Sequence, residues 1–372
     1  MSNNKVRVGI IGGSINNGWA KGTHIPSIQQ LPELELAAVS TSRMESAEES
    51  AREFNAAHAF ANANDLSQHS DVDMVVVSVK VVEHYDAVKA AASAGKHVYS
   101  EWPLGSSTAE AIDMQKLAEA NHIHNTVGLQ ARQAPEINYL KDLIAEGYVG
   151  KVLSVNLRAY TEVMGGTGFS SSRYVFDKTA GGNLLAIYGG HSLDALTYIL
   201  GDFTELSAAL ENQYNQAEVI GTGEIVEKTS DDQILIHGKL NSGAMASVHI
   251  QGGVKQPGLY LEVYGDKGML VLQNAKGSIQ MGPYKLSGAH QTEEEPKASL
   301  KELTVPDSYR WVPDGINNQG GPVINVAQAL RKFAKDIQEG TFRMPTFADA
   351  VKVHQLLDTI EKAANTGERQ YL

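Results

Sequence analysis

The chain has 372 residues, which exceeds one compact core and predicts two domains. Its net charge of -12 argues against a direct nucleic-acid partner, because phosphate backbones need a surplus of Lys and Arg. The absence of cysteine excludes disulfides and thiol nucleophiles. The N-terminus runs directly into a strand and no apolar run approaches the ~20 residues of a membrane helix, so we expect a cytoplasmic protein without a membrane partner.

The first 130 residues alternate short apolar runs with Ala-rich amphipathic segments. These runs carry β-branched residues at both odd and even positions, which is typical of buried parallel strands. This alternation predicts an α/β domain with a doubly wound parallel sheet over residues 1–130. We expect strands at 5–11, 34–40, 74–79, 97–100 and 125–129, and helices at 46–54, 84–94 and 107–121.

Longer strand-like stretches separated by Gly-containing turns follow residue 150. They predict an α+β domain over residues 131–372, with a large, mostly antiparallel open sheet. We expect strands at 152–161, 205–211, 233–240, 244–251, 259–264 and 268–273, and helices at 184–200, 322–339 and 347–366, the last of which could pack back on the first domain. The polar segment 284–321 is interpreted as a mobile loop or lid.

A glycine-rich turn follows the first strand, and its Gly12, Gly13, Ser14, Gly18 and Trp19 are candidates for cofactor binding. Such a turn before a helix lets backbone N–H groups approach a pyrophosphate. Ser14 stands where the usual fingerprint has its second glycine, so a tight strand-to-helix loop is the alternative interpretation. The position directly after an N-terminal strand favours dinucleotide binding.

The second strand ends in Ser40, Thr41, Ser42 and Arg43. An acidic residue here would bind the adenosine ribose of NAD, and none is present. Hydroxyl groups with an arginine suit a 2′-phosphate through charge-assisted hydrogen bonds. This favours NADP over NAD. The alternative interpretation of these four residues is a polar turn with a solvated arginine.

The glycine turn, Glu101-Trp102-Pro103 and Gly189-Gly190-His191 together resemble the glucose-fructose oxidoreductase, inositol dehydrogenase and rhizopine-catabolism (GFO/IDH/MocA) family. The resemblance covers nearly the whole chain. It implies an N-terminal Rossmann domain, hydride transfer between a nicotinamide and a sugar, polyol or keto-sugar, and an open sheet that often forms oligomer contacts. On this basis we expect a homodimer or homotetramer.

Within that family, three motifs resemble the subgroup of the fungal galactose-pathway co-repressor and its bacterial relatives. They are Gly18-Trp19-Ala20, the sequence Glu-Trp-Pro-Leu at 101–104, and Leu-Gln-x-Arg at 129–132. The fungal protein is similar to an oxidoreductase but regulates transcription through a protein partner. The resemblance therefore leaves two functions open, a dehydrogenase or reductase and a non-catalytic dinucleotide sensor.

The resemblance implies a catalytic Lys, Asp and His, and only the histidine is retained here, as His191. Trp102 stands in place of the lysine and Ile187 in place of the aspartate. Alcohol oxidation needs a group that accepts a proton, which indole and isoleucine cannot do. His191 is therefore the candidate general acid/base. Lys80, at a neighbouring strand end, is a candidate replacement for the missing lysine. The alternative interpretation is that Lys80 is an ordinary surface lysine.

The remaining candidates lie near the same strand ends or in the second domain. Trp102 could stack on a sugar or on the nicotinamide. Scattered histidines give no motif for metal ligands, so we expect no metal site. Further cofactor candidates are Val79, His84, Glu101, Trp102, Pro103 and Gln130, and further substrate candidates are Arg132, Arg173, Tyr174 and Tyr188.

Overall fold

The computed structural model describes residues 5–16 and 18–372, so Asn17 of the glycine turn lies outside the described residues. The chain forms two compact units. The first comprises Met1–Gln130 and Trp311–Lys352, and the second comprises Ala131–Arg310 and Val353–Leu372. Among the described residues, no helix is both long and apolar enough to cross a membrane.

The first unit contains a six-stranded parallel sheet in the order β3-β2-β1-β4-β5-β6, which confirms the doubly wound arrangement. The strand order reverses between β1 and β4, and in such sheets ligands bind where that reversal occurs. The strands are β1 (Val6–Ile11), β2 (Leu34–Ser40), β3 (His58–Phe60), β4 (Met74–Val77), β5 (His97–Glu101) and β6 (Asn125–Gly128).

Helices connect these strands, and side-chain caps fix the starts of two of them. Asn62 accepts the Asp65 N–H at the start of α3, and Ser107 accepts the Glu110 N–H at the start of α5. A π-helix, Ala20–His24, precedes the first α-helix. The α-helices are α1 (Ile25–Gln30), α2 (Met44–Phe54), α3 (Ala63–Gln68), α4 (His84–Ser93) and α5 (Thr108–Ala120).

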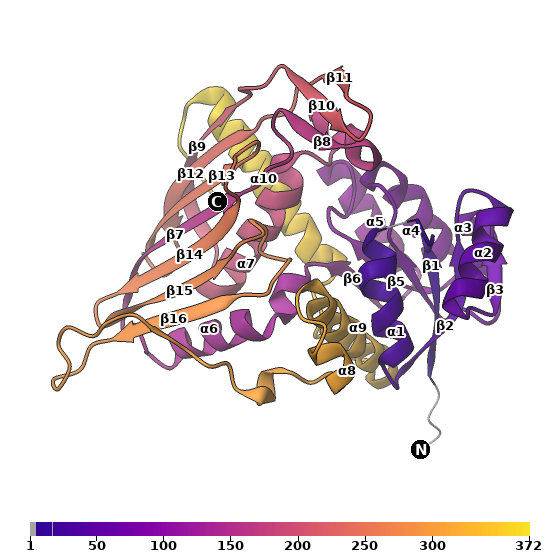
Figure 1. Ribbon diagram of the computed structural model, residues 1–372, viewed down its shortest axis with the longest axis horizontal. Coiled ribbons are helices and arrows are strands. Elements are labelled where there is room, and N and C mark those ends of the chain that lie inside the picture. Colours follow the sequence, from indigo (N-terminus) through magenta and orange to yellow (C-terminus); the bar gives the residue numbers. More distant parts are fainter. Residues whose placement is uncertain (1–4, 17) are drawn as a thin grey trace. The chain divides into compact units, whose positions relative to one another are not determined.

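The helix α9 (Pro322–Glu339) completes the core of the first unit, although it lies far away in the sequence. Figure 1 shows it beside α1, against which it packs. Its Leu330 and Phe333 share one buried cluster with Ile10 and Tyr99 of the sheet. The structural division therefore differs from a single boundary after residue 130, because the apolar face of α9 covers this sheet.

The second unit is built on a nine-stranded sheet in the order β17-β16-β15-β14-β7-β13-β12-β9-β18. Only β7 and β13 pair in parallel, so the sheet is mostly antiparallel, as the sequence predicted. Its strands are β7 (Val152–Tyr160), β9 (Phe203–Glu211), β12 (Gln233–Leu240), β13 (Met245–Gln251), β14 (Gly258–Gly265), β15 (Gly268–Asn274), β16 (Lys285–His290), β17 (Lys301–Glu302) and β18 (Gln370–Tyr371).

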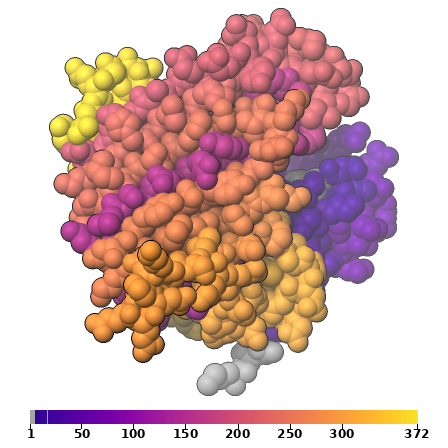
Figure 2. Space-filling view, turned by 60° about the vertical axis from the view of Figure 1, so that its left-hand side comes forward, coloured from indigo at the N-terminus to yellow at the C-terminus, as the bar shows by residue number. Residues whose placement is uncertain are grey.

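Helices cover one face of this sheet, and the other face is open. Alternate residues such as Val155, Leu157 and Ala159 are buried on the face where α6 (Pro135–Ala145) and α7 (Gly190–Leu200) lie. Figure 2 shows the open face, where β7 in magenta runs between strands in salmon and orange. The period-two burial of the strands produces this separation.

The interpretation of 284–321 as a mobile loop or lid is wrong for its first part. Residues 285–290 form β16, which pairs with β15, and Leu286 lies directly opposite Leu272 in the buried layer. The segment also contains β17 and the short helix α8 (Asp314–Asn317). The physical reason is that a strand needs few apolar residues when hydrogen bonds to a neighbouring strand satisfy its backbone.

A small three-stranded sheet, with the order β11-β10-β8, was not predicted from the sequence. Its strands are β8 (Thr167–Phe169), β10 (Gln216–Ile220) and β11 (Glu224–Glu227). They are short and largely exposed, so they lack the long apolar pattern by which strands are recognised. The last helix, α10 (Phe347–Thr366), begins and ends as the sequence predicted.

Candidate functional site

The turn after β1 packs closely against the ends of β2 and β4. The backbone N–H groups of Gly12 and Gly13 donate to the Ser40 carbonyl oxygen at 2.9 and 3.2 Å. Gly12 has a φ of +89°, and a Cβ there would lie 2.2 Å from the carbonyl oxygen of Ser78. Only glycine satisfies both the conformation and the space, so this turn is held where the strand order reverses.

A cavity of about 570 Å³ opens at this turn. Seven of the predicted cofactor residues line it: Gly12, Ser14, Ser40, Thr41, Ser42, Arg43 and Val79. Ser46, Asn62, Glu83 and Asp86 line it as well and were not predicted. Asn62 follows β3, a strand too short to be recognised from the sequence, whereas Glu83 and Asp86 lie beside the predicted start of a helix.

The other predicted residues of the glycine turn do not line this cavity. Gly13 is buried and Gly18 is exposed. Trp19 is partly buried and packs against the apolar core, and its carbonyl oxygen accepts the Thr23 hydroxyl at 2.7 Å. The structure therefore gives Trp19 a packing position.

Glu101 lies in a buried polar cluster at the end of β5. Its Oε1 is 2.6 Å from Nε2 of His24, and its Oε2 accepts the Gln130 amide at 3.4 Å. The His24 ring also meets the Tyr99 ring edge-on, at a centroid distance of 5.3 Å. The side chains of His24 and Glu101 are 0% and 11% exposed, so this buried contact fixes the strand end that precedes Trp102.

The buried side chain of His84 contacts the backbone of two predicted cofactor segments. Its Nδ1 lies 2.9 Å from the Pro103 carbonyl oxygen and its Nε2 lies 3.2 Å from that of Val79. Burial lowers the pKa of His84, so the neutral ring has one N–H to donate. His84 therefore positions backbone and does not line the cavity.

Trp102 and Lys80 differ sharply in exposure. Trp102 is 5% exposed, and neither residue is among those that line the cavity. Lys80 is exposed and lies between β4 and a short 3-10 helix, Val81–Glu83. Lys80 is therefore in contact with solvent, whereas Trp102 lies in the interior.

His191 is the second residue of α7 and is 2% exposed. A π-helix, Leu185–Gly189, directly precedes α7, and such helices occur frequently at functional sites. Asp194, three residues after His191 on the same helix, was not predicted. Its carboxylate accepts one hydrogen bond from Arg132 Nε, shared between both oxygens at 3.1 Å, and one from Nη2 at 2.6 Å. Arg132 is therefore held near the start of α7 by a buried carboxylate.

The remaining substrate candidates of the second unit lie in different environments. Tyr188 donates its hydroxyl to Thr161 Oγ1 at 3.2 Å, and burial raises the pKa of Tyr188. Burial also raises the pKa of Tyr174. Arg173 is exposed and forms an ion pair with Glu224 at 2.9 Å. Both tyrosines are thus neutral hydrogen-bond donors at ordinary pH, while Arg173 has an acidic neighbour on the surface.

Two family descriptions match the chain. Residues 6–129 match the GFO/IDH/MocA oxidoreductases with an NAD-binding Rossmann fold, and residues 135–274 match the C-terminal domain of Gal80p. Together these matches span most of the two units. The first contains the cavity and the second contains His191.

Curated relatives include both a dehydrogenase and a regulator. The dehydrogenase aclE of Aspergillus oryzae is 29% identical over 377 residues, which cover 98% of this chain and 97% of the relative. The galactose/lactose metabolism regulatory protein GAL80 of Kluyveromyces lactis is also 29% identical, over 308 residues that cover 75% of this chain. That match spans 66% of the regulator's own length.

Solved structures give the same two kinds of relative. The transcriptional regulator Gal80p from Kluyveromyces lactis superimposes with a TM-score of 0.85, at 25% identity, over 100% of this chain and 92% of that protein. Levoglucosan dehydrogenase in complex with NADH and levoglucosan has a TM-score of 0.85 at 21% identity, over 99% of both chains. The fold is therefore shared by proteins of both functional classes.

Proposed function

We propose that the chain belongs to the GFO/IDH/MocA family of NAD-binding oxidoreductases, whose description matches residues 6–129, and that it transfers hydride between a nicotinamide dinucleotide and a sugar, polyol or keto-sugar in the cytoplasm. The observation that carries the proposal is the cavity at the glycine turn, which seven predicted cofactor residues line. Backbone N–H groups and short side chains there suit a pyrophosphate. The sugar dehydrogenase among the similar structures supports the substrate class.

The cavity also bears on the choice between NADP and NAD. Arg43, Ser42 and Thr41 line it without an acidic residue at the end of β2, which favours the 2′-phosphate of NADP. Glu83 and Asp86 line the same cavity and oppose an added negative charge. We propose NADP as the preferred cofactor, with the phosphate on the Arg43 side.

Calorimetric titration with NADP, NADPH, NAD and NADH tests the cofactor assignment. NADPH is expected to bind more tightly than NADH, and Arg43→Ala is expected to reduce that preference by about tenfold, the effect of losing one charge-assisted hydrogen bond. Arg52→Ala, on the exposed side of α2, is the matched control. Absence of heat with all four dinucleotides would refute dinucleotide binding itself.

His191 is the proposed general acid/base, since imidazole can both accept and donate a proton near neutral pH. Lys80 is proposed to orient the reacting oxygen in place of the missing family lysine. Trp102 would contribute an apolar surface and no proton transfer. The reaction needs no other acid or base from the chain, because hydride leaves with its electron pair and only the hydroxyl proton must move.

A second candidate function is a non-catalytic dinucleotide sensor that acts through a protein partner. The substitution of the family's lysine and aspartate by Trp102 and Ile187 favours it, as does the relationship to GAL80. In this case the cofactor cavity would bind a dinucleotide while no hydride is transferred. The two functions thus share the first unit and differ in whether His191 meets a substrate.

Nicotinamide absorbance with sugars, polyols and keto-sugars separates the two functions. Turnover supports the enzyme, and tight cofactor binding without turnover in either direction supports the sensor. For an active protein, His191→Asn and Lys80→Met are expected to lower kcat by at least about a hundredfold and tenfold, respectively. His122→Asn and Lys116→Met, at exposed positions, are the matched controls.

We also propose that the protein is a homodimer or homotetramer formed through the open face of the nine-stranded sheet (Figure 2). Leu235, Met245 and Tyr260 are exposed there by 49%, 54% and 37%. Apolar side chains on an uncovered sheet are typical of an interface. Light scattering on the purified protein tests this, and Met245→Lys is expected to shift the mass towards the monomer.

A further inference from the structure

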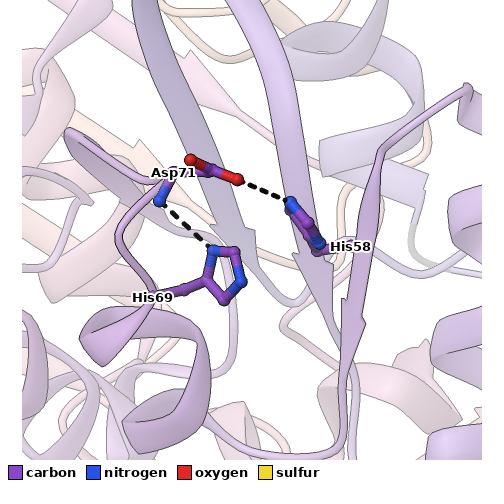
Figure 3. A group of neighbouring side chains, drawn as sticks. All are labelled: His58, His69 and Asp71. Carbon is purple, nitrogen blue, oxygen red and sulfur yellow. Dashed lines mark hydrogen bonds and ion pairs between the residues drawn. The ribbon is translucent and has the colours of Figure 1, made fainter.

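Three side chains with metal-binding atoms meet in the first unit, outside the cofactor cavity (Figure 3). His58 opens β3, His69 follows the last residue of α3, and Asp71 lies in the turn before β4. One potential ligand atom from each residue lies within 4.8 Å of the others. The two imidazole rings are 4.1 Å apart between centroids. All three side chains are partly exposed, so an ion can reach them from solvent.

The hydrogen bonds among these residues hold their polar atoms close together. The Asp71 backbone N–H donates to Nδ1 of His69 at 3.3 Å, so an ion would have to displace this hydrogen bond or bind the other ring nitrogen, Nε2. Oδ2 of Asp71 faces Nε2 of His58 at 3.1 Å. The other oxygen, Oδ1, accepts a hydrogen bond from Arg7 at 2.9 Å. A carboxylate held in this way by a neighbouring group is typical of a metal ligand.

The charges around the cluster are balanced before any ion binds. Arg7 also pairs with Asp73, at 2.7 Å, and Nζ of Lys96 donates to the His69 carbonyl oxygen at 3.0 Å, so two cationic side chains stand against two carboxylates. The nearby ring of Phe60, 5.4 Å from that of His69, covers one side of the cluster. An ion here would thus be partly shielded from water.

We propose that His58, His69 and Asp71 bind one divalent transition-metal ion, with Zn²⁺ as the best match to two imidazoles and one carboxylate. Water would take the fourth position. Ligand atoms around a tetrahedral Zn²⁺ are about 3.4 Å apart, so side-chain movements of about 1 Å would close the site. The expectation of no metal site arose because these residues are spread over 14 positions without a recognised spacing.

Such an ion would join the two ends of the segment 58–71. The middle of this segment supplies Ala61, Asn62 and Ala63 to the cofactor cavity. The ion would therefore act as a structural clamp on one wall of that cavity, without taking part in any chemical step. This role is independent of whether the protein is an enzyme or a sensor.

Titration of tag-free, chelator-treated protein with Zn²⁺, and separately with Co²⁺, tests the proposal. We expect one ion per chain by calorimetry and the visible absorption of four-coordinate Co²⁺. His69→Gln and Asp71→Asn are each expected to weaken binding by at least about tenfold. His97→Gln is the matched control, because His97 and His124 form another imidazole pair, at a centroid distance of 5.2 Å, and this variant should bind like the unmodified protein.

Thermal unfolding in the presence of chelator shows whether each variant folds. His69→Gln leaves the contacts of Asp71 with Arg7 and His58 in place, so it keeps the test valid if Asp71→Asn unfolds. Added Zn²⁺ should raise the unfolding temperature of the unmodified protein and of His97→Gln, and not that of His69→Gln. Absence of bound ion, or equal binding by the unmodified protein and His69→Gln, would overturn the proposal.

Discussion

His24 and Glu101, separated by 77 positions in the sequence, form a buried hydrogen-bonded pair in which Nε2 lies 2.6 Å from Oε1. Replacing His24 by Leu would leave the carboxylate buried without this partner. We expect the free energy of unfolding to fall by roughly 2 kcal/mol, the usual cost of leaving a buried polar group without its hydrogen-bond partner. Urea unfolding of His24→Leu measures this loss.

The double variant His24→Leu/Glu101→Leu serves as the control for this pair, because it removes both polar side chains. It should recover part of the lost stability, since no carboxyl group is left in the interior without its partner. Equal losses in the single and double variants would show that packing, and not the lost partner of the Glu101 carboxyl group, accounts for the effect.

Gly12→Ala is expected to damage both stability and cofactor binding. The added Cβ would lie 2.2 Å from the Ser78 carbonyl oxygen, and the φ of +89° is unfavourable for alanine. We expect a loss of about 3 kcal/mol in unfolding free energy. Gly22→Ala is the matched control, because a Cβ there meets no atom within 4 Å. Similar stability for the two variants would contradict the assigned close approach.

Asp194→Asn tests the contact that holds Arg132. The neutral amide can accept one hydrogen bond from the guanidinium but cannot balance its charge, so we expect a loss of about 2 kcal/mol. Thermal or urea unfolding gives the stability, and kinetic constants report any change in a substrate site. Asp358→Asn, on an exposed turn of α10, is the comparison. A variant as stable as the unmodified protein would mean that this ion pair contributes nothing measurable.

The buried imidazole of His354 predicts a dependence of stability on pH. Burial lowers the pKa of His354 to about 4, below the ordinary value of 6.5. Between these values the unfolded chain binds more protons than the folded one, so stability is complete above about pH 6.5 and falls as the pH decreases towards 4. The loss from this group is on the order of 3 kcal/mol.

His354→Leu provides the check on that pH dependence. Urea unfolding across the same pH range should give a flatter profile for the variant, because leucine binds no proton. His97, whose pKa is also lowered to about 4 by burial and by the neighbouring His124, contributes in the same direction and remains in both proteins. Identical profiles for His354→Leu and the unmodified protein would contradict the assignment.

Periodic apolar segments predicted the long elements well. The helix expected over 322–339 is α9, and the strand expected over 34–40 is β2. Strands that are stabilised mainly by an adjacent strand were not predicted. The strand β3 has three half-buried residues, and β16 was interpreted as part of a loop. In such elements, hydrogen bonds to an adjacent strand replace the local apolar pattern.

The candidate site was predictable where function depends on backbone and on residue type. Gly12 and Arg43 both line the cavity, as expected from a glycine turn and a strand end. The partners of buried groups were not predictable, because Asp194 and Arg132 are 62 positions apart. The π-helix before His191 was also missed, since one extra residue per turn leaves no clear mark in the sequence.

The position of α9 has a consequence for synthesis of the chain on the ribosome. The apolar residues Ile10 and Tyr99 emerge early, yet Leu330 and Phe333 of α9, which share their buried cluster, emerge more than 200 positions later. The first unit therefore cannot complete its core until almost the whole protein has been translated. Nascent chains would expose that unfinished surface to chaperones, and a fragment cut after residue 130 would be prone to aggregate.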